Sequence, residues 1–300
     1  MEDGRGMMED GRGMMRRFLI IMMMVAVLTG CGRKRVSRAD VTVDLLLPMT
    51  PVKNQGKSEL CWAYAMLATI ETEHLLRGDS VNLSAVYVGR MLEDVRCKKE
   101  DVRCKKDDVR CKKDDGGGKD TKWQRAMCQT LLNIIQRYGI VPYDVLPDDA
   151  TPDLPTPRWV FMLGMKYTPL EFAHSVCAPN EYLSLTCLPD SPYYRPVEVP
   201  VPDNWEHNRL LNIPLDTLKQ RVERALDNRH PVCWESKGHA MAIVGKAHDK
   251  RGRAYYIMKN SWGTSEKSDG MVYMSARRMW RDMAALYMTR DAYDGKAVAQ

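Results

Sequence analysis

Four residue types in this chain of 300 residues could together carry out covalent chemistry, and in chain order they are Gln55, Cys61, His239 and Asn260. A cysteine thiolate is a strong nucleophile, and it needs a base or ion-pair partner, which an imidazole can provide. An asparagine amide can hold an imidazole in one orientation, and a glutamine amide can donate to an oxyanion. A lone Cys61 is more simply explained as a buried core residue. The four types together predict nucleophilic catalysis.

The predicted elements place these side chains at ends of helices and strands. The pattern from Leu60 to Arg77 predicts a helix with Cys61 in its first turn, where the helix dipole and a cationic histidine would lower the pKa of the thiol. His239 heads the apolar strand AMAIVG, and Asn260 ends the returning strand, with the sequence SWG directly after it. A helix-rich first half and a strand-rich second half predict two lobes, with a site in the cleft between them.

Four segments carry a resemblance to the papain-like cysteine peptidases: NQG at 54–56, CWAYA at 61–65, GHAMAIVG at 238–245 and KNSWGT at 259–264. The resemblance extends over roughly residues 50 to 290. It implies an α+β, papain-like two-lobe fold, with a helical left lobe, a β-barrel right lobe and the active-site cleft between them. It also implies a role for each site residue. Gln55 would contribute to the oxyanion hole, and Cys61 would be the nucleophile. His239 would act as base and acid, and Asn260 would orient it.

The same resemblance assigns supporting residues and a branch. Trp262 would shield the His239–Asn260 hydrogen bond from water, and Trp62 beside the nucleophile would support the site. Within the family, the chain is most similar to the bleomycin hydrolase and aminopeptidase C branch. The segments behind this are YGIVPYD (138–144), LSLT (183–186), VPDNW (201–205) and PLDTL (214–218).

The chain also departs from the papain pattern. Ser58 replaces a disulfide cysteine, and Glu59 and Leu60 replace small residues beside the nucleophile, so both are candidate substrate-binding residues that could narrow or close the cleft. The run Gly116, Gly117 and Gly118 is either a glycine strip that pairs with substrate backbone or simply the end of a repeat. The departures leave an alternative open, in which a catalytically dead scaffold acts as an envelope binding lipoprotein. Acyl transfer to an amine would use the same residues.

The N-terminus predicts a signal peptide at 1–31. Arg16 and Arg17 precede an apolar run at 18–28, which is shorter than the roughly 20 residues of a membrane-spanning helix. The run closes with LTGC, which resembles a bacterial lipobox and makes Cys31 the lipidated residue; a plain secretory signal is the alternative. Because MEDGRGM is repeated upstream, translation could start at Met14 or Met15. We therefore expect a lipid anchor in a bacterial envelope, with the outer membrane favoured and no propeptide between Cys31 and Gln55.

Downstream of the anchor we expect a tether at 32–49 and a catalytic domain at 50–300 with an insertion at about 93–119. The insertion repeats DVRCKK three times with nearly balanced charges, which predicts a solvated surface segment. Its cysteines lack the spacing of zinc knuckles, so no metal and no cofactor is expected. A net charge of +6 with short basic runs gives no nucleic-acid signal, so peptide or protein substrates and the membrane are the expected partners.

Further elements follow from periodicity and turn residues. We expect a strand in VTVDLLLP, a helix capped by Ser84, a helix ending near Gly139 and loops with short strands over 150–205. A helix at about 214–229 and an apolar strand should then precede a β-hairpin that turns at Asp249 and Gly252. Cys177 and Cys187 could form a disulfide, although their spacing does not require one.

Overall fold

A computed structural model describes residues 36–93, 125–151, 154–266 and 268–298. The elements described below belong to one compact unit, Ser37–Gln300. The predicted signal peptide with Cys31, most of the repeat insertion, and Gly116 to Gly118 lie outside the described residues. The helices and strands are α2 (Cys61–Leu76), α4 (Cys128–Tyr138), α5 (Pro169–Val176), α6 (Leu215–Asp227), α7 (Ala276–Asp282), α8 (Arg290–Asp294), β1 (Val41–Leu46), β2 (Val160–Met162), β3 (Met165–Tyr167), β4 (Tyr182–Thr186), β5 (Pro196–Glu198), β6 (Arg209–Asn212), β7 (Val232–Ser236), β8 (Ala240–Asp249), β9 (Ala254–Lys259), β10 (Met271–Ser275) and β11 (Met283–Thr289).

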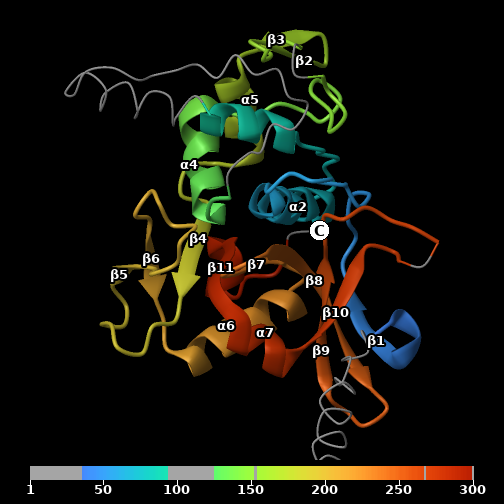
Figure 1. Cartoon of the computed structure of the whole chain (residues 1–300), viewed down its shortest axis with the longest axis vertical. Coiled ribbons are helices and arrows are strands. Elements are labelled where there is room, and N and C mark those ends of the chain that lie inside the picture. Colours follow the sequence, from blue (N-terminus) through green and yellow to red (C-terminus); the bar gives the residue numbers. More distant parts are fainter. Residues whose placement is uncertain (1–35, 94–124, 152–153, 267, 299–300) are drawn as a thin grey trace, which may run out of the picture. The chain divides into compact units, whose positions relative to one another are not determined.

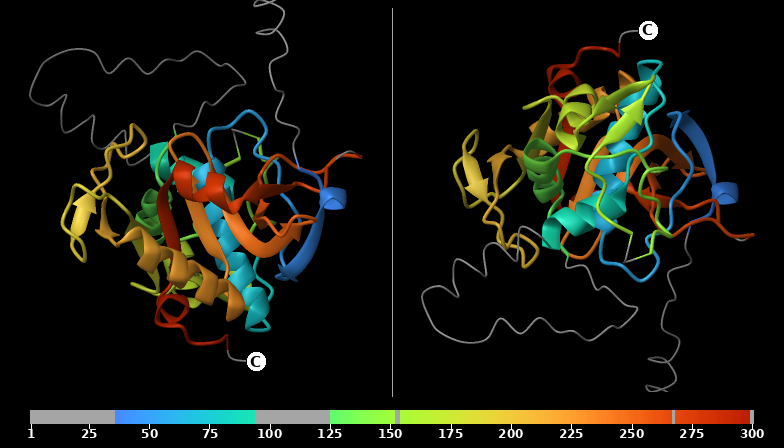
Figure 2. Two further views of the ribbon diagram at one scale, coloured as in Figure 1. Left: turned by 90° about the horizontal axis from the view of Figure 1, so that it is seen from below. Right: turned by 90° about the horizontal axis from the view of Figure 1, so that it is seen from above.

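Helix α2 is the central element, and it agrees with the helix predicted from Leu60 to Arg77. Every residue from Cys61 to His74 is buried, including the polar residues of its second half. Its buried carboxylates are paired, Glu71 with Lys53 at 2.6 Å and Glu73 with His230 at 2.8 Å. Figure 1 shows α2 between the helices α4 and α5 and the strands, and Figure 2 shows it running alongside β7 and β8.

The first hydrophobic core joins α2 to the other helices of the N-terminal half. It includes Leu67 and Ile70 of α2, Leu131 of α4 and Phe172 of α5. The predicted Ser84 cap is present, since the backbone N–H of Tyr87 donates to the Ser84 hydroxyl at 3.0 Å before the helix at 85–93. These helices form the helical part of the fold.

Helix α4 ends where the sequence predicts, at Gly139. That glycine has a φ of +84°, and a Cβ there would lie 2.1 Å from the Pro169 carbonyl carbon. Only glycine therefore allows the close approach of α4 to the start of α5. Helix α5 itself falls in the region predicted as loops and short strands. The start of this helix is marked in the sequence by a capping box. The Thr168 side chain accepts from the Glu171 N–H, and the Glu171 side chain accepts from the Thr168 N–H.

In the described part of the chain the strands form a nine-stranded, mostly antiparallel sheet in the order β10-β9-β8-β7-β11-β4-β6-β5, with β1 paired to β8. Strand β8 is almost continuously buried because α2 contacts it as well as α6. A second core forms where Leu218 and Val222 of α6 pack with Ile243, Met258 and other apolar residues of the sheet. The predicted α+β class with a helical and a strand-rich part is confirmed.

Strand β1 lies inside the segment expected to be a tether. It pairs with β8 from Val41 opposite Asp249 to Leu46 opposite Gly245, so residues 41–46 belong to the sheet. A Cβ at Gly245 would lie 2.3 Å from the Leu45 carbonyl oxygen, which explains why glycine stands at this crossing. The strand expected in VTVDLLLP is therefore confirmed. In the described residues no helix combines the length and apolar character that crossing a bilayer requires.

Candidate active site

Cys61 is the first residue of α2, directly after Leu60, and its residue surface is 2% exposed. The first-turn N–H groups of a helix have no intrahelical partner, so this end favours negative charge. Burial nevertheless raises the pKa of the Cys61 thiol above its ordinary value, while Arg125 and backbone hydrogen bonds from Ala240 and Trp62 lower it. The expected lowering of the thiol pKa is corrected, because burial is the largest effect on it and raises it. A raised pKa favours the thiol form of Cys61 and makes a base more important for its attack.

His239 lies in a tight turn just before β8, so its neighbour Ala240 reaches Cys61. The turn is held by Ser236, whose hydroxyl accepts from the His239 N–H at 3.1 Å and whose N–H donates to the His239 carbonyl at 2.8 Å. Burial lowers the pKa of His239, the Asn260 hydrogen bond opposes this, and the Arg125 charge lowers it further. A neutral imidazole, ready to accept a proton, is therefore the dominant form at neutral pH.

Asn260 fixes which imidazole nitrogen carries the proton. The Asn260 Oδ1 atom accepts from the Ser261 N–H at 2.9 Å, and a backbone N–H can only donate, so the oxygen of this amide is correctly assigned. The same Oδ1 lies 2.8 Å from His239 Nε2, which must therefore carry the hydrogen. His239 Nδ1 is left as the basic atom. The Trp262 ring stacks on the imidazole with centroids 5.0 Å apart, and its position fits the expected shielding role.

Gln55 is joined to the Asn260 end of β9 by backbone pairing. The Gln55 N–H donates to the Ser261 carbonyl at 2.8 Å, and the Gly263 N–H donates to the Lys53 carbonyl at 3.0 Å. The Gln55 side chain accepts from the Ser261 hydroxyl at 2.5 Å and donates to the Ser58 carbonyl at 2.7 Å. An amide nitrogen has two hydrogens, so one remains to donate to an oxyanion.

Two predicted neighbours of the nucleophile lie in the core. Leu60 and Trp62 are both 0% exposed and belong to the helical core. Leu60 therefore does not line the cleft, and its expected substrate-binding role is corrected; its size is explained by packing. Trp62 packs in the same core, and its carbonyl accepts from the Cys128 thiol at 3.4 Å. Glu59 is exposed.

Arg125 is a residue of the site that the sequence reasoning missed. Its Nε donates to Asp203 at 2.5 Å and its Nη1 donates to the carbonyl of Gly238, the residue before His239. Its Nη2 is buried and has no hydrogen-bond partner among the described residues. The guanidinium charge lowers the pKa of both Cys61 and His239. Arg125 thus pins the histidine turn and favours the thiolate.

Replacing Arg125 with glutamine should lower kcat/KM about 10- to 100-fold, because the turn loses its anchor and Cys61 loses a nearby positive charge. Since the charge lowers the pKa of His239, its loss should also move the acid limb of the pH–rate profile to higher pH. Arg125→Lys should retain part of the activity. Arg137→Gln, at an exposed arginine of α4, is the matched control. The double variant Arg125→Gln, Asp203→Asn avoids leaving the Asp203 carboxylate unpaired. An unchanged pH–rate profile in this double variant would contradict the role of Arg125.

A buried carboxylate lies behind Arg125. Glu235 of β7 is 1% exposed and accepts from the Tyr287 hydroxyl at 2.7 Å and from the N–H of Cys128 at 3.2 Å. Burial raises its pKa from 4.5 to about 7, although Tyr287, Cys128 and Arg125 oppose this. The Cys128 and Cys233 sulfur atoms lie 3.6 Å apart beside it. Both are free thiols, as are Cys177 and Cys187, so the possible disulfide between the latter two is absent in the structure.

The raised pKa of Glu235 predicts a pH-dependent stability. The folded state binds this proton more tightly than the unfolded state, so the free energy of unfolding falls as pH rises from 4.5 to 7. The Glu235→Gln variant should lack about 3 kcal/mol of this decrease in the free energy of unfolding. Above pH 7 the variant should therefore be more stable than the native chain. Urea denaturation at acidic and mildly alkaline pH measures the difference, with exposed Glu59→Gln as the control. A Glu235→Gln curve parallel to the native one would contradict the shift.

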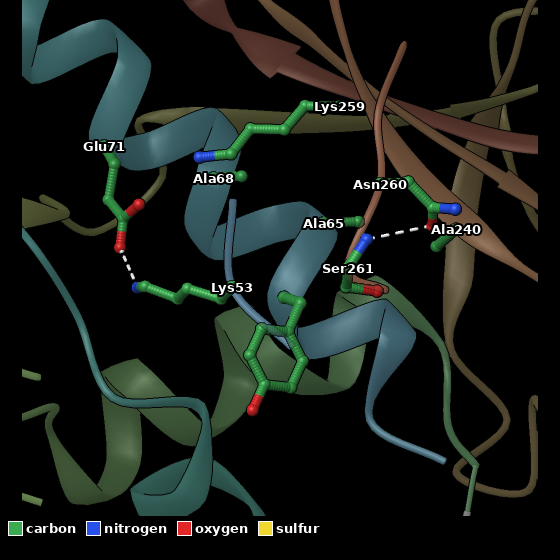
Figure 3. Close-up of a pocket in the computed structure, with 9 residues that line it drawn as sticks. Lys53, Ala65, Ala68, Glu71, Ala240, Lys259, Asn260 and Ser261 are labelled. Atoms are coloured by element: carbon green, nitrogen blue, oxygen red, sulfur yellow. Dashed lines mark hydrogen bonds and ion pairs between the residues drawn. The ribbon is translucent and has the colours of Figure 1, made fainter. Parts of the chain in front are cut away.

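A small pocket lies beneath Asn260 (Figure 3), lined by Lys53, Tyr64, Ala65, Ala68, Glu71, Ala240, Lys259, Asn260 and Ser261. Burial lowers the pKa of Lys259 to about 8, and its ammonium donates to Thr50, which donates to Glu71 at 2.5 Å. The network ties α2 to the strand end that carries Asn260. No cluster of metal ligands occurs among the described residues.

Parts of this chain are similar to known proteins. Residues 226–289, which include His239 and Asn260, match the family model of papain family cysteine proteases. PepW from Lactobacillus rhamnosis has a similar structure, with a TM-score of 0.61 and 17% identity over 84% of this chain and 82% of that chain. Ananain from Ananas comosus is 22% identical over 247 residues, 80% of this chain. The chain spans about half the length of ananain, 54%.

The α+β fold of this chain, with a helical part and a strand-rich part, is thus similar to the fold of PepW. The match to the papain family cysteine protease model covers part of the strand-rich half and includes the histidine and the asparagine of the site.

Proposed function

We propose that this chain is a cysteine peptidase in which Cys61 is the nucleophile and His239 its base and acid. The observation that carries the proposal is the arrangement around His239. Its Nε2 is bound to Asn260 at 2.8 Å under the Trp262 ring, and its neighbour Ala240 hydrogen-bonds to the Cys61 sulfur. This leaves His239 Nδ1 as the nitrogen that can accept a proton, and Ala240 links the histidine turn to the buried Cys61 thiol.

In the acylation step, Cys61 Sγ attacks the carbonyl carbon of a peptide while its proton passes to His239 Nδ1. The carbonyl oxygen becomes an oxyanion, which the Gln55 amide and the Cys61 backbone N–H stabilise. The carbon–nitrogen bond then breaks, and the leaving amine takes the proton from the imidazolium. The products are a free amine and a thioester on Cys61.

In the deacylation step, neutral His239 removes a proton from water, and the resulting hydroxide attacks the thioester carbonyl. The carbon–sulfur bond breaks, the carboxylic acid leaves, and Cys61 recovers its proton from His239. Asn260 keeps the imidazole in one orientation through both steps, so the same nitrogen serves as base and acid.

We also propose the finer points that the sequence motivates. The segments YGIVPYD and VPDNW support a place near the bleomycin hydrolase and aminopeptidase C branch. The lipobox-like LTGC supports a lipid anchor at Cys31 and a bacterial envelope location. Peptides or proteins are the substrates.

The test is cleavage profiling of the chain on a peptide library with free and blocked N-termini. Cleavage supports the peptidase, and the preference for one set distinguishes exo- from endo-cleavage. Absence of cleavage across both sets, together with no covalent labelling by an epoxysuccinyl peptide, would contradict the proposal and favour a binding lipoprotein on an inactive scaffold.

A further inference from the structure

The β2–β3 hairpin exposes a cluster of large apolar side chains. The cluster comprises Trp159 (46% exposed), Phe161 (71%), Met162 (37%), Leu163 (96%) and Met165 (59%). Strand β2 pairs with β3 in a two-stranded sheet separate from the main one, and Figure 1 places the hairpin beyond α5, away from that sheet. Soluble proteins rarely expose so many large apolar residues together unless the surface binds a partner.

The turn geometry keeps the most exposed of these residues at the tip. Leu163 and Gly164 have φ values of 51° and 76°, the left-handed conformation of a two-residue hairpin turn. Asparagine or glycine is favoured at such a position, and a leucine there is strained. The strain and the 96% exposure both argue that the Leu163 side chain does not serve the fold of the unit.

The hairpin also has a definite charge. Arg158 and Lys166 flank the apolar cluster, and no acidic residue occurs from 158 to 167. Lys166 pairs with Phe161 across the hairpin, and its ammonium lies 3.8 Å from the centre of the Trp159 ring. A cation and an indole thus lie together behind the Leu163 tip. This order of residues matches the layers of a membrane interface. Apolar side chains at the tip suit the hydrocarbon, and tryptophan and basic residues behind them suit the phosphate-containing headgroups.

We propose that the β2–β3 hairpin docks on an anionic phospholipid membrane, with Phe161 and Leu163 inserted among the acyl chains and Lys166 and Arg158 at the phosphates. A membrane fits better than a protein partner, because the apolar residues form a projecting tip instead of a groove or flat face. This contact does not rest on peptidase activity or on the predicted anchor. It would orient the domain on the surface to which an anchor tethers it.

The test uses a chain that begins at Ser37, so that the apolar segment at 18–28 cannot itself bind lipid. The unit Ser37–Gln300 contains both hydrophobic cores and the whole sheet, and is therefore expected to fold alone. Sedimentation with vesicles of phosphatidylcholine and phosphatidylglycerol should pull down this chain. The double variant Phe161→Ser, Leu163→Ser should bind at least about tenfold more weakly. Lys166→Gln should bind about fivefold more weakly.

Leu46→Ser, at a leucine of β1 that is 44% exposed, is the matched control and should bind like the native sequence. Circular dichroism establishes that each variant is folded. Equal binding by the hairpin double variant, or no vesicle binding by the native sequence, would overturn the proposal. Binding that is equally strong to pure phosphatidylcholine would overturn the role of Lys166 and Arg158. A concentration-dependent dimer that the double variant abolishes, without vesicle binding, would identify a second copy as the partner instead.

Discussion

Cys61→Ala is expected to lower kcat/KM for peptide hydrolysis by at least about 10⁴-fold, to the background rate. Without the sulfur no thioester can form, and the oxyanion donors and His239 have no covalent intermediate to act on. The fold should survive, because alanine is smaller than cysteine and a helix favours it. The measurement is the initial rate on the best peptide from the library profile, with thermal unfolding to establish the fold.

Cys187→Ala is the matched control, since Cys187 is another free thiol, is partly exposed and lies on none of the site elements. Its activity should equal that of the native chain. Hydrolysis that continues in Cys61→Ala and stops in Cys187→Ala would show that Cys187, and not Cys61, is the nucleophile.

His239→Ala is expected to lower kcat/KM by about 10³-fold. Burial raises the pKa of the Cys61 thiol above 9.0, so without a base very little thiolate exists at neutral pH. The leaving amine would also lose its proton donor. The exposed His207, which pairs with Glu198 at the surface, provides the control variant His207→Ala with full activity.

The pH–rate profile gives a second readout of His239. In the native chain the imidazole must be neutral, so activity should rise through a pKa below 6.5 and fall only when the thiol ionises above pH 9.0. In His239→Ala the acid limb should disappear, and the residual rate should keep rising with pH as the thiol ionises unaided. An acid limb that persists in the variant would show that another group is the base.

The sequence predicted well those parts of the fold that local pattern controls. The helical spacing of apolar residues after Leu60 predicts α2, and AMAIVG predicts the buried strand β8, because period and burial are encoded within a dozen residues. The order of Gln55, Cys61, His239 and Asn260 was likewise enough to expect one site. The structure brings Gln55, His239 and Asn260 together through the pairing of residues 53–55 with 261–263 and through the turn held by Ser236.

Long-range contacts account for what could not be predicted. Arg125 carries no local signal: its partners, Asp203 and Gly238, lie far along the chain and meet it only in the folded state. The thiol pKa was misjudged for a similar reason, since the helix dipole is visible in the sequence and the burial of Cys61 is not. Leu60 was expected at the cleft because sequence proximity to a nucleophile does not reveal on which side of the backbone a side chain packs.

The most direct test of the central claim, that Cys61 is a nucleophile activated by His239, is the rate at which iodoacetamide alkylates each cysteine at neutral pH, measured by peptide mass spectrometry. Cys61 should be alkylated faster than Cys187, even though Cys187 is the more exposed thiol, and His239→Ala should remove that advantage. Alkylation of Cys61 that is no faster than that of Cys187 in the native chain, or that is unchanged in His239→Ala, would contradict the account.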